Sequence, residues 1–147
     1  MAEPAEIFSL LARIDDGWAH LWDRVEKLSA DELQASAGNA DGWPLSIVLA
    51  HIGRWEEWHR DAIEKHLVDG SAKSYDGYES WNEAWANEDR DLAPVDARRR
   101  LQDTHHEFRR LLGELRSDQW DDAVTRWTQT CTYTHYEEHL GELVPRA

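Results

Sequence analysis

The segment Thr-Tyr-Thr-His-Tyr-Glu-Glu-His-Leu, residues 132–140, carries two histidines four residues apart. On an α-helix, such residues lie about 40° apart around the axis and about one turn apart along it. Both imidazoles can therefore reach one point beside the helix, which is how a helix offers two nitrogen ligands to a metal ion. Many His-x-x-x-His pairs on exposed helices bind nothing. The pair becomes informative only if another helix brings a third ligand to the same point.

The composition describes an acidic chain of 147 residues, with 16 Lys+Arg against 30 Asp+Glu and a formal net charge of −14. This charge repels phosphate backbones and anionic membrane surfaces, so we expect neither a nucleic-acid partner nor a membrane partner. The longest apolar run, residues 45–50 with one serine inside it, is too short to span a bilayer. The length fits a single domain, 1–147, with its own hydrophobic core.

The single cysteine, Cys131, rules out an internal disulfide and favours a reducing compartment. The first residues do not resemble a cationic and apolar export leader. We therefore expect a cytoplasmic protein. The closing residues 143–146 resemble the remnant of a protease-cleavage tag, and we assign them no function.

Apolar residues recurring every three or four positions predict four amphipathic helices, over residues 5–28, 44–67, 94–115 and 122–143. Residues 29–42 are predicted to form a loop. The connection 69–93 is longer than neighbouring antiparallel helices need, and residues 80–87 within it are predicted to form a short helix. A chain that crosses back along a bundle needs such a link. We therefore predict an all-α four-helix bundle in which the second and third helices run parallel, an up-down-down-up arrangement.

The last helix contains five threonines between residues 125 and 134. Because β-branched side chains lose rotamer freedom in a helix, they lower its helix propensity. We expect a local irregularity near Cys131.

His51 lies at the edge of the apolar face of the second helix and is the candidate for the third ligand. It lies about 10 Å from one end of a bundle about 30 Å long, and His135 lies about 20 Å from the other end, so the two should meet in one layer. The expected site is His51, His135 and His139 around a divalent ion, with a coordination position left open. Taken alone, each histidine could instead be a hydrogen-bonded core residue.

Two further residues belong to the same region. His105, on the apolar seam of the third helix, is a candidate fourth ligand or an outer partner of the ligands. Cys131, one turn before His135, is either a small buried hydrophobic residue or a thiolate ligand. We interpret His20, His59 and His66 as ordinary helix residues.

Residues 43–52, followed by Trp55 and Glu56, resemble the second-helix motif of the DinB-like four-helix-bundle superfamily. Residues 133–139 resemble its fourth-helix motif, especially that of the ClbS/DfsB branch, and residues 78–82 are in keeping with it. The resemblance implies an up-down-down-up bundle and a divalent metal, often zinc or nickel, on His51, His135 and His139. The superfamily includes thiol-dependent transferases and isomerases that use mycothiol or bacillithiol, and genotoxin-resistance proteins. Cys131 and Thr134 stand where that branch tends to have Asn and Glu.

These observations favour a metal-dependent enzyme that acts on a small electrophile by hydrolysis or by thiol transfer and isomerisation. A bound metal would lower the pKa of a water or thiol and so provide a nucleophile at neutral pH. Glu138 and Glu142, near the histidines of the fourth helix, and Glu57 on the second helix are candidates for moving protons. For each of them the alternative is an ordinary solvated acid.

Two other hypotheses compete with the enzyme. The nine tryptophans could line a cavity in which a non-catalytic protein sequesters a toxic small molecule. Alternatively, the bundle is structural and its histidines are hydrogen-bonded in a dry core. A homodimer is also conceivable, formed through an apolar patch around Trp81 and Trp85.

Overall fold

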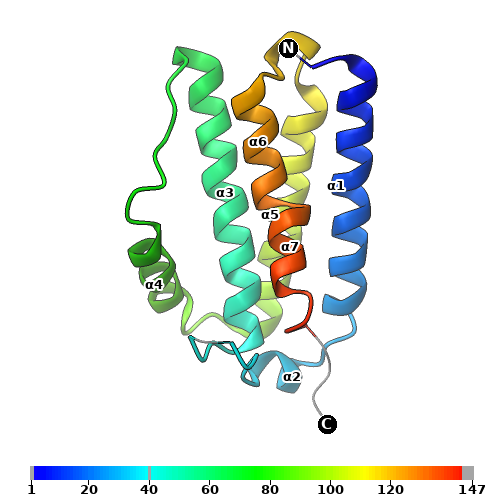
Figure 1. The fold of residues 1–147 in the computed structure, drawn as a ribbon. Coiled ribbons are helices and arrows are strands. Elements are labelled where there is room, and N and C mark those ends of the chain that lie inside the picture. The colour runs from blue at the N-terminus through cyan, green and yellow to red at the C-terminus, as the bar shows by residue number, and fades with distance from the viewer. Residues whose placement is uncertain (1, 40, 144–147) are drawn as a thin grey trace.

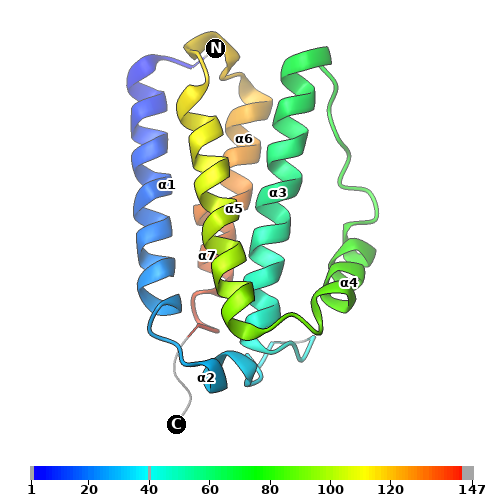
Figure 2. The same ribbon diagram turned by 180° about the vertical axis from the view of Figure 1, so that it is seen from behind.

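The computed structural model describes residues 2–39 and 41–143. The main elements are α1 (Pro4–Val25), α3 (Leu45–Asp69), α5 (Pro94–Glu114) and a fourth rod formed by α6 (Asp122–Cys131) and α7 (Tyr133–His139). The four rods lie side by side (Figures 1 and 2). Helices α3 and α5 run in one direction, and α1 and α6–α7 run in the other. The predicted all-α, up-down-down-up bundle is confirmed.

Two short helices join the rods. Helix α2 (Ala30–Gln34) lies in the segment that we predicted to be a loop, so that prediction was wrong. The Ser29 hydroxyl accepts a hydrogen bond from the Glu32 N–H, and the Glu32 carboxylate accepts one from the Ser29 N–H. This reciprocal capping box stabilises a helix start even in a short segment. Helix α4 (Tyr78–Asp89) is the helix predicted in the long connection, and it is longer than the predicted 80–87.

The ends of α3 are set by proline and glycine. Pro44 is the residue just before the helix, with an extended backbone, rather than a member of its first turn as we expected. At the other end Gly70 adopts a φ of 72° and donates its N–H to the His66 carbonyl. This left-handed conformation is accessible to glycine at little cost and ends the helix.

The fourth rod is interrupted at Thr132, whose φ and ψ of −108° and −114° belong to neither α6 nor α7. Threonine hydroxyls bond backward to backbone carbonyls here: Thr132 donates to Thr128, and Thr128 donates to Thr125. Such bonds bend helices. The irregularity expected near Cys131 is therefore confirmed, and α7 starts as a new helix that carries both histidines of the 132–140 segment.

The core consists of two apolar clusters with a polar layer between them. One cluster contains Leu21, Val25, Leu28, Leu33, Ala37, Leu45, Val48, Leu49, Ile52, Leu101, Tyr136 and Leu143. The other contains Ile14, Ala62, Ile63, Phe108, Leu112, Trp120, Val124, Trp127, Cys131 and Tyr133. Glu56 and His59 of α3 are buried between the two clusters. Thr104 and His105 of α5 are buried at the same level. Because buried polar groups need partners, this layer is where specific interactions concentrate.

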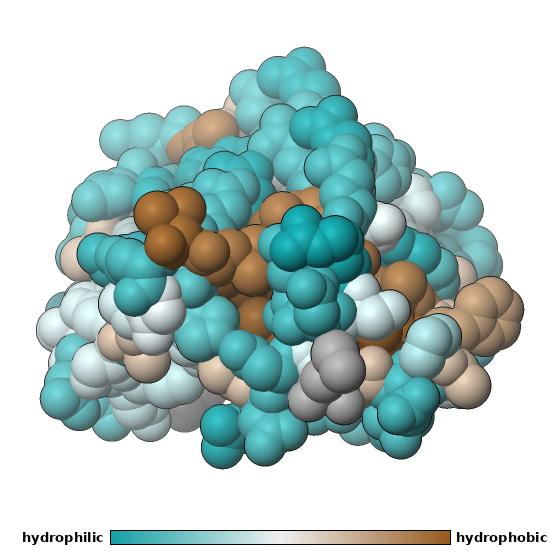
Figure 3. All heavy atoms as spheres, turned by 90° about the horizontal axis from the view of Figure 1, so that it is seen from above, coloured by the Kyte–Doolittle hydropathy of each residue, from teal (hydrophilic) through white to brown (hydrophobic). Residues whose placement is uncertain are grey.

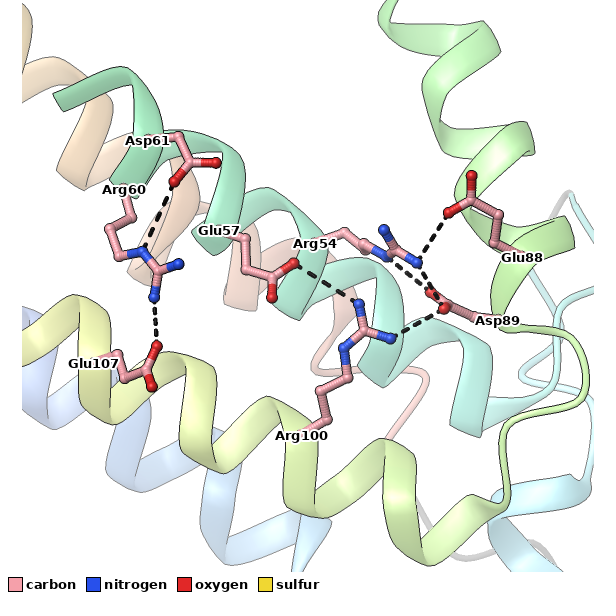
Figure 4. A network of polar contacts seen from close by, with 8 residues as sticks. All are labelled: Arg54, Glu57, Arg60, Asp61, Glu88, Asp89, Arg100 and Glu107. Carbon is pink, nitrogen blue, oxygen red and sulfur yellow. Dashed lines mark hydrogen bonds and ion pairs between the residues drawn. The ribbon is translucent and has the colours of Figure 1, made fainter. Parts of the chain in front are cut away.

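A network of ion pairs holds α4 against α3 and α5 (Figure 4). Arg54 of α3 donates two hydrogen bonds to Asp89, at 3.1 and 2.9 Å, and Arg100 of α5 donates one at 3.0 Å. Burial alone would raise the pKa of Asp89, but the hydrogen bonds and charges of these two arginines lower it overall. A buried carboxylate with two cationic partners fixes the position of α4 on the bundle.

Figure 3 looks down the end of the bundle where α3 ends and α6 begins. Hydrophilic residues make up most of this face, and hydrophobic residues show between them. Over residues 2–39 and 41–143, none of the helices combines the length and the apolar character needed to span a membrane. Of the residues that resemble a tag remnant, 144–146 lie outside the described residues.

Candidate metal centre

The three histidines predicted to bind metal lie together inside the bundle. The Nε2 atom of His51, on α3, is 3.1 Å from Nε2 of His135, on α7. His139 places its Nε2 atom 3.2 Å from the same His135 atom. These residues form the only group of three or more potential metal ligands within the described part of the chain. We call them the histidine cluster.

The surroundings of His51 and His135 favour neutral imidazoles. Burial and the nearby His139 lower the pKa of His51 to about 3. Burial, together with the three neighbouring histidines His51, His139 and His59, lowers the pKa of His135 well below its ordinary value. A neutral imidazole keeps a lone pair on one ring nitrogen, which is the form that coordinates metals.

Glu142 orients one member of the cluster. Its carboxylate accepts a hydrogen bond from Nδ1 of His139, and both side chains are mostly buried. Because that bond places the proton on Nδ1, the lone pair of Nε2 points toward the other two histidines. Carboxylate–histidine pairs of this kind commonly support metal ligands. Nδ1 of His51, by contrast, is buried without a hydrogen-bond partner among the described residues.

The donor set fits a divalent ion. Nitrogens bound tetrahedrally to one zinc ion at about 2.0–2.1 Å lie roughly 3.3 Å from one another. Two of the three separations, 3.1 and 3.2 Å, are close to that value, and all three ligand atoms lie within 4.8 Å of one another. Three protein ligands would leave the fourth coordination position open, which is the arrangement of catalytic rather than structural zinc sites.

A pocket of about 400 Å³ opens beside the cluster. Its lining residues are His51, Trp55, His59, Tyr75, Tyr78, Asn82, Thr130, Cys131, His135 and Glu138. They come from α3, from the segment before α4, from α4 itself and from α6–α7. A small molecule in this pocket would therefore contact two of the three histidines.

The three acidic residues predicted to move protons are in different places. Glu138 is exposed and lines the pocket. Glu142 is bonded to His139 and is part of the support of the cluster. Glu57 lies at another cleft and pairs with Arg100 at 3.7 Å, so the structure does not bring it to the histidines.

His105 does not join the histidine cluster, which argues against the first of the two roles that we considered for it, a fourth ligand. Its Nδ1 atom is 2.7 Å from Oε1 of Glu56 and 3.0 Å from the Tyr136 hydroxyl, which donates to the other Glu56 oxygen at 2.9 Å. Its ring stacks on Trp18 with centroids 3.8 Å apart. Glu56, His105 and Tyr136, here called the buried triad, are each at most 2% exposed.

Cys131 lines the pocket, but its side chain is almost fully buried. Burial and the negative charge of Glu56 raise the pKa of the thiol well above its ordinary value. A thiol that keeps its proton behaves as a small apolar side chain. The structure therefore favours the buried-hydrophobe interpretation of Cys131 over the thiolate ligand.

Sequence reasoning missed His59 and Tyr75. We interpreted His59 as an ordinary helix residue, but it is 1% exposed and lines the pocket. Its Nδ1 donates to the Trp55 carbonyl at 2.7 Å, and its Nε2 accepts from the Tyr75 hydroxyl at 2.7 Å. Spacing could have found it, because Ile52, Glu56, His59 and Ile63 follow one another at intervals of four, three and four residues.

The aromatic patch expected to favour self-association is partly covered. Trp81 and Trp85 of α4 pack on Trp55 of α3, with ring centroids 6.0 and 5.1 Å away. Both indoles are half-buried. They thus pack behind Trp55, which lines the pocket, and self-association stays a prediction.

The fold and the three converging histidines define the class of the protein as a DinB-like four-helix bundle. The model of one family, described as the mycothiol maleylpyruvate isomerase N-terminal domain, matches residues 14–140. The chain belongs to this family. Searches of curated proteins and of solved structures found no match.

Proposed function

We propose that this protein is a metal-dependent enzyme that joins a low-molecular-weight thiol to a small electrophile, in a transfer or isomerisation reaction. The observation that carries the proposal is the convergence of three Nε2 atoms, 3.1 and 3.2 Å apart, beside a pocket of about 400 Å³. The family description, which names mycothiol and an isomerase, supports the choice of a thiol. Hydrolysis at the same centre is the variant in which water replaces the thiol.

His51, His135 and His139 would hold the divalent ion, zinc or nickel, through their Nε2 atoms. When bound, that ion would supply the positive charge that lowers the pKa of a thiol or water to near neutrality. Glu142 holds His139 in the tautomer that this role requires. Glu138, which lines the pocket, would accept the proton that the nucleophile loses. Trp55 and Tyr75, which line the pocket, would provide its aromatic surface to the substrate.

Metal content and turnover test this proposal together. Native mass spectrometry of freshly purified protein, with and without a chelator, should show one divalent ion per chain that the chelator removes. Consumption of mycothiol with 1-chloro-2,4-dinitrobenzene should then exceed one equivalent per chain and should require the ion. Protein that binds no zinc or nickel when either is supplied would rule out the proposal.

The aromatic surroundings of the pocket favour one competing function, the binding and sequestering of a small molecule. Trp58 stacks on Tyr75 with centroids 4.9 Å apart, and Trp55 contacts both rings. A sequestering protein would protect only in stoichiometric amounts. Turnover beyond one equivalent therefore separates the two functions.

A further inference from the structure

Two polar side chains that line the pocket, His59 and Asn82, are both hydrogen-bonded to Trp55. The Trp55 carbonyl accepts a hydrogen bond from Nδ1 of His59 at 2.7 Å, and the Trp55 indole N–H donates one to Oδ1 of Asn82 at 2.8 Å. A carbonyl oxygen can only accept, and an indole N–H can only donate. Trp55 therefore decides which atoms of His59 and Asn82 remain for other partners.

On the His59 side, this bond fixes the direction of the next one. The carbonyl places the ring proton on Nδ1, and burial lowers the pKa of His59 to about 4, so Nε2 carries a lone pair at neutral pH. The Tyr75 hydroxyl, 2.7 Å from Nε2, must then be the donor of their hydrogen bond. Burial raises the pKa of Tyr75 to about 12, and the nearby Cys131 adds to the shift, so the hydroxyl keeps its proton. The Tyr75 oxygen can therefore accept a hydrogen bond from a ligand, whereas its own proton is already used.

On the Asn82 side, the indole N–H fixes the orientation of the amide. The opposite orientation would set the NH₂ group against another donor, so the oxygen must face Trp55. Asn82 makes no other side-chain hydrogen bond in the described part of the chain, and its NH₂ group is left to donate. The pocket thus offers an acceptor at Tyr75 and a donor at Asn82.

The rings around these two groups favour a flat ligand. Trp55, Tyr75 and Tyr78 line the pocket of about 400 Å³, and Trp58 stacks behind Tyr75 with an angle of 26° between the ring planes. Flat aromatic walls in a pocket of this size match a planar molecule, and a few polar groups fix its orientation.

We infer that the substrate is a planar molecule that carries an N–H or O–H donor for the Tyr75 oxygen and an acceptor, such as a carbonyl, for the Asn82 NH₂ group. The inference rests on the proposed function, because it takes the pocket beside the histidine cluster as the substrate site. It concerns hydrogen bonding and leaves the charge of the substrate open, since the proposed ion would attract an anionic group. A ligand without the donor sets an acceptor against the Tyr75 oxygen and loses that hydrogen bond without a replacement.

Three ring compounds of similar size test the inference. 4-Hydroxyacetophenone offers both groups, 4-methoxyacetophenone lacks the donor, and 4-ethylphenol lacks the acceptor. Isothermal titration calorimetry at pH 6.5, where the phenols are largely neutral, should be run on the protein as purified and after chelator treatment. Because a net hydrogen bond is worth up to about 10-fold in affinity, we expect 4-hydroxyacetophenone to bind about 10-fold more tightly than either other compound in both preparations. Equal or tighter binding of a compound that lacks one group, or no binding of any probe, would overturn the inference.

Three variants show whether Tyr75 causes the preference for a donor. Tyr75→Phe removes the accepting oxygen and should abolish the preference for the hydroxy ketone over the methoxy ketone. His59→Leu removes the group that holds the Tyr75 proton, so the freed hydroxyl can donate and the methoxy ketone should gain affinity relative to the hydroxy ketone. Tyr78→Phe changes another tyrosine of the pocket lining and should keep the preference. An unchanged preference in Tyr75→Phe would contradict the inference.

Asn82→Asp tests the other half of the inference. It keeps an oxygen for the Trp55 indole and replaces the NH₂ group with an acceptor. Its affinity for 4-hydroxyacetophenone should fall about 10-fold relative to that for 4-ethylphenol. Asn87→Asp adds the same charge to α4 outside the lining of this pocket and should leave the ratio unchanged. An Asn82→Asp ratio equal to that of Asn87→Asp would contradict the assignment of a donor at Asn82.

These measurements fail independently of the proposed function. Probe binding to chelator-treated protein needs neither metal nor turnover, and the metal content of each sample is measured separately. A protein that binds metal and turns over mycothiol but prefers the methoxy ketone would keep the proposed function and lose the substrate class. A protein that shows the expected order of probes but holds no metal would lose the proposed function.

Discussion

The histidine cluster and the buried triad both contain buried histidines, but the surroundings of those histidines are opposite. The two groups are adjacent at consecutive residues of α7, His135 and Tyr136. In the triad, His105 is paired with a carboxylate and a phenol and stacked on an indole. In the cluster, the three Nε2 atoms face one another, and no acid or carbonyl approaches them in the described contacts. A buried nitrogen paired with an acid has a structural partner, whereas nitrogens that face only one another are suited to sharing an ion, as we propose.

Removing a ligand from the cluster is the change with the largest expected effect. A structural zinc site with four ligands contributes about 10–16 kcal/mol of binding, or roughly 2.5–4 kcal/mol for each ligand. His135→Ala should therefore weaken zinc or nickel binding by roughly 10²–10³-fold. Competition with a chromophoric chelator measures the affinity, and far-UV circular dichroism checks that the helices remain.

The exposed His20 provides the matched control, since its ring contacts only the Asp16 carbonyl in the described hydrogen bonds. His20→Ala should bind metal as the unmodified protein does. Equal metal content in His135→Ala and His20→Ala, measured by elemental analysis, would show that the histidine cluster is not the metal site.

The triad should respond in the reverse way, with a loss of stability and no loss of metal. Glu56→Ala leaves His105 and Tyr136 buried without their shared acceptor. Breaking a buried pair costs about 3–5 kcal/mol, and we expect about 3 because the two remaining groups are already 3.0 Å apart. Urea denaturation gives the free energy of unfolding, and native mass spectrometry gives the metal content.

Glu57→Ala is the control for that experiment, because Glu57 is the next residue on α3 but is only half-buried and pairs with Arg100 at 3.7 Å. Its loss should change stability by less than about 1 kcal/mol. If Glu56→Ala lowered metal affinity as much as His135→Ala does, the two regions would not be separable.

Glu142 is not a ligand itself but supports the histidine cluster by holding His139. Removing a carboxylate that holds a metal-binding histidine typically lowers the affinity for the metal by about 10–100-fold. Glu142→Ala should fall in that range, between the unmodified protein and His135→Ala, when the same chelator competition is used. Glu137→Ala, an exposed acid on α7, should have no effect. An affinity of Glu142→Ala equal to that of Glu137→Ala would mean that the His139 contact does not support a ligand.

Much of this architecture could be predicted from the sequence. The periodic apolar residues gave the four rods, the length of the 69–93 connection gave their directions, and helix arithmetic placed His51 and His135 in one layer. These inferences depend on distances along single helices. The threonine-rich stretch also indicated the break at Thr132, because β-branched residues and hydroxyl groups weaken helices locally.

The sequence could not indicate which histidines have partners, because partners come from other helices. His105 occupies an apolar position, and only the packing of α3 against α5 shows that Glu56 accepts its hydrogen bond. Glu57, on the same helix as His51, was a candidate for moving protons, but it pairs with Arg100 of α5. The pocket depends on the segment before α4, where spacing carries no information about the position of Tyr75.

His59 is intermediate between the two regions and gives the smallest predicted effect. It is buried like His105, but its partners are a carbonyl and a phenol rather than an acid. Burial lowers its pKa to about 4, whereas in the unfolded chain the pKa returns to its ordinary value of 6.5. Between these two values the unfolded state binds more protons, so the free energy of unfolding falls as the pH drops below 6.5.

Chelator-treated protein should therefore lose about 1 kcal/mol of stability from this one group between pH 7 and pH 5.5. His59→Gln keeps a polar side chain but cannot titrate, so its stability should fall by about that much less over the same interval. Urea denaturation at the two pH values measures both slopes, and the other histidines contribute equally to each protein. Parallel slopes would mean that His59 takes up its proton as readily in the folded state as in the unfolded state. It would then resemble a solvated histidine, and burial would not lower its pKa.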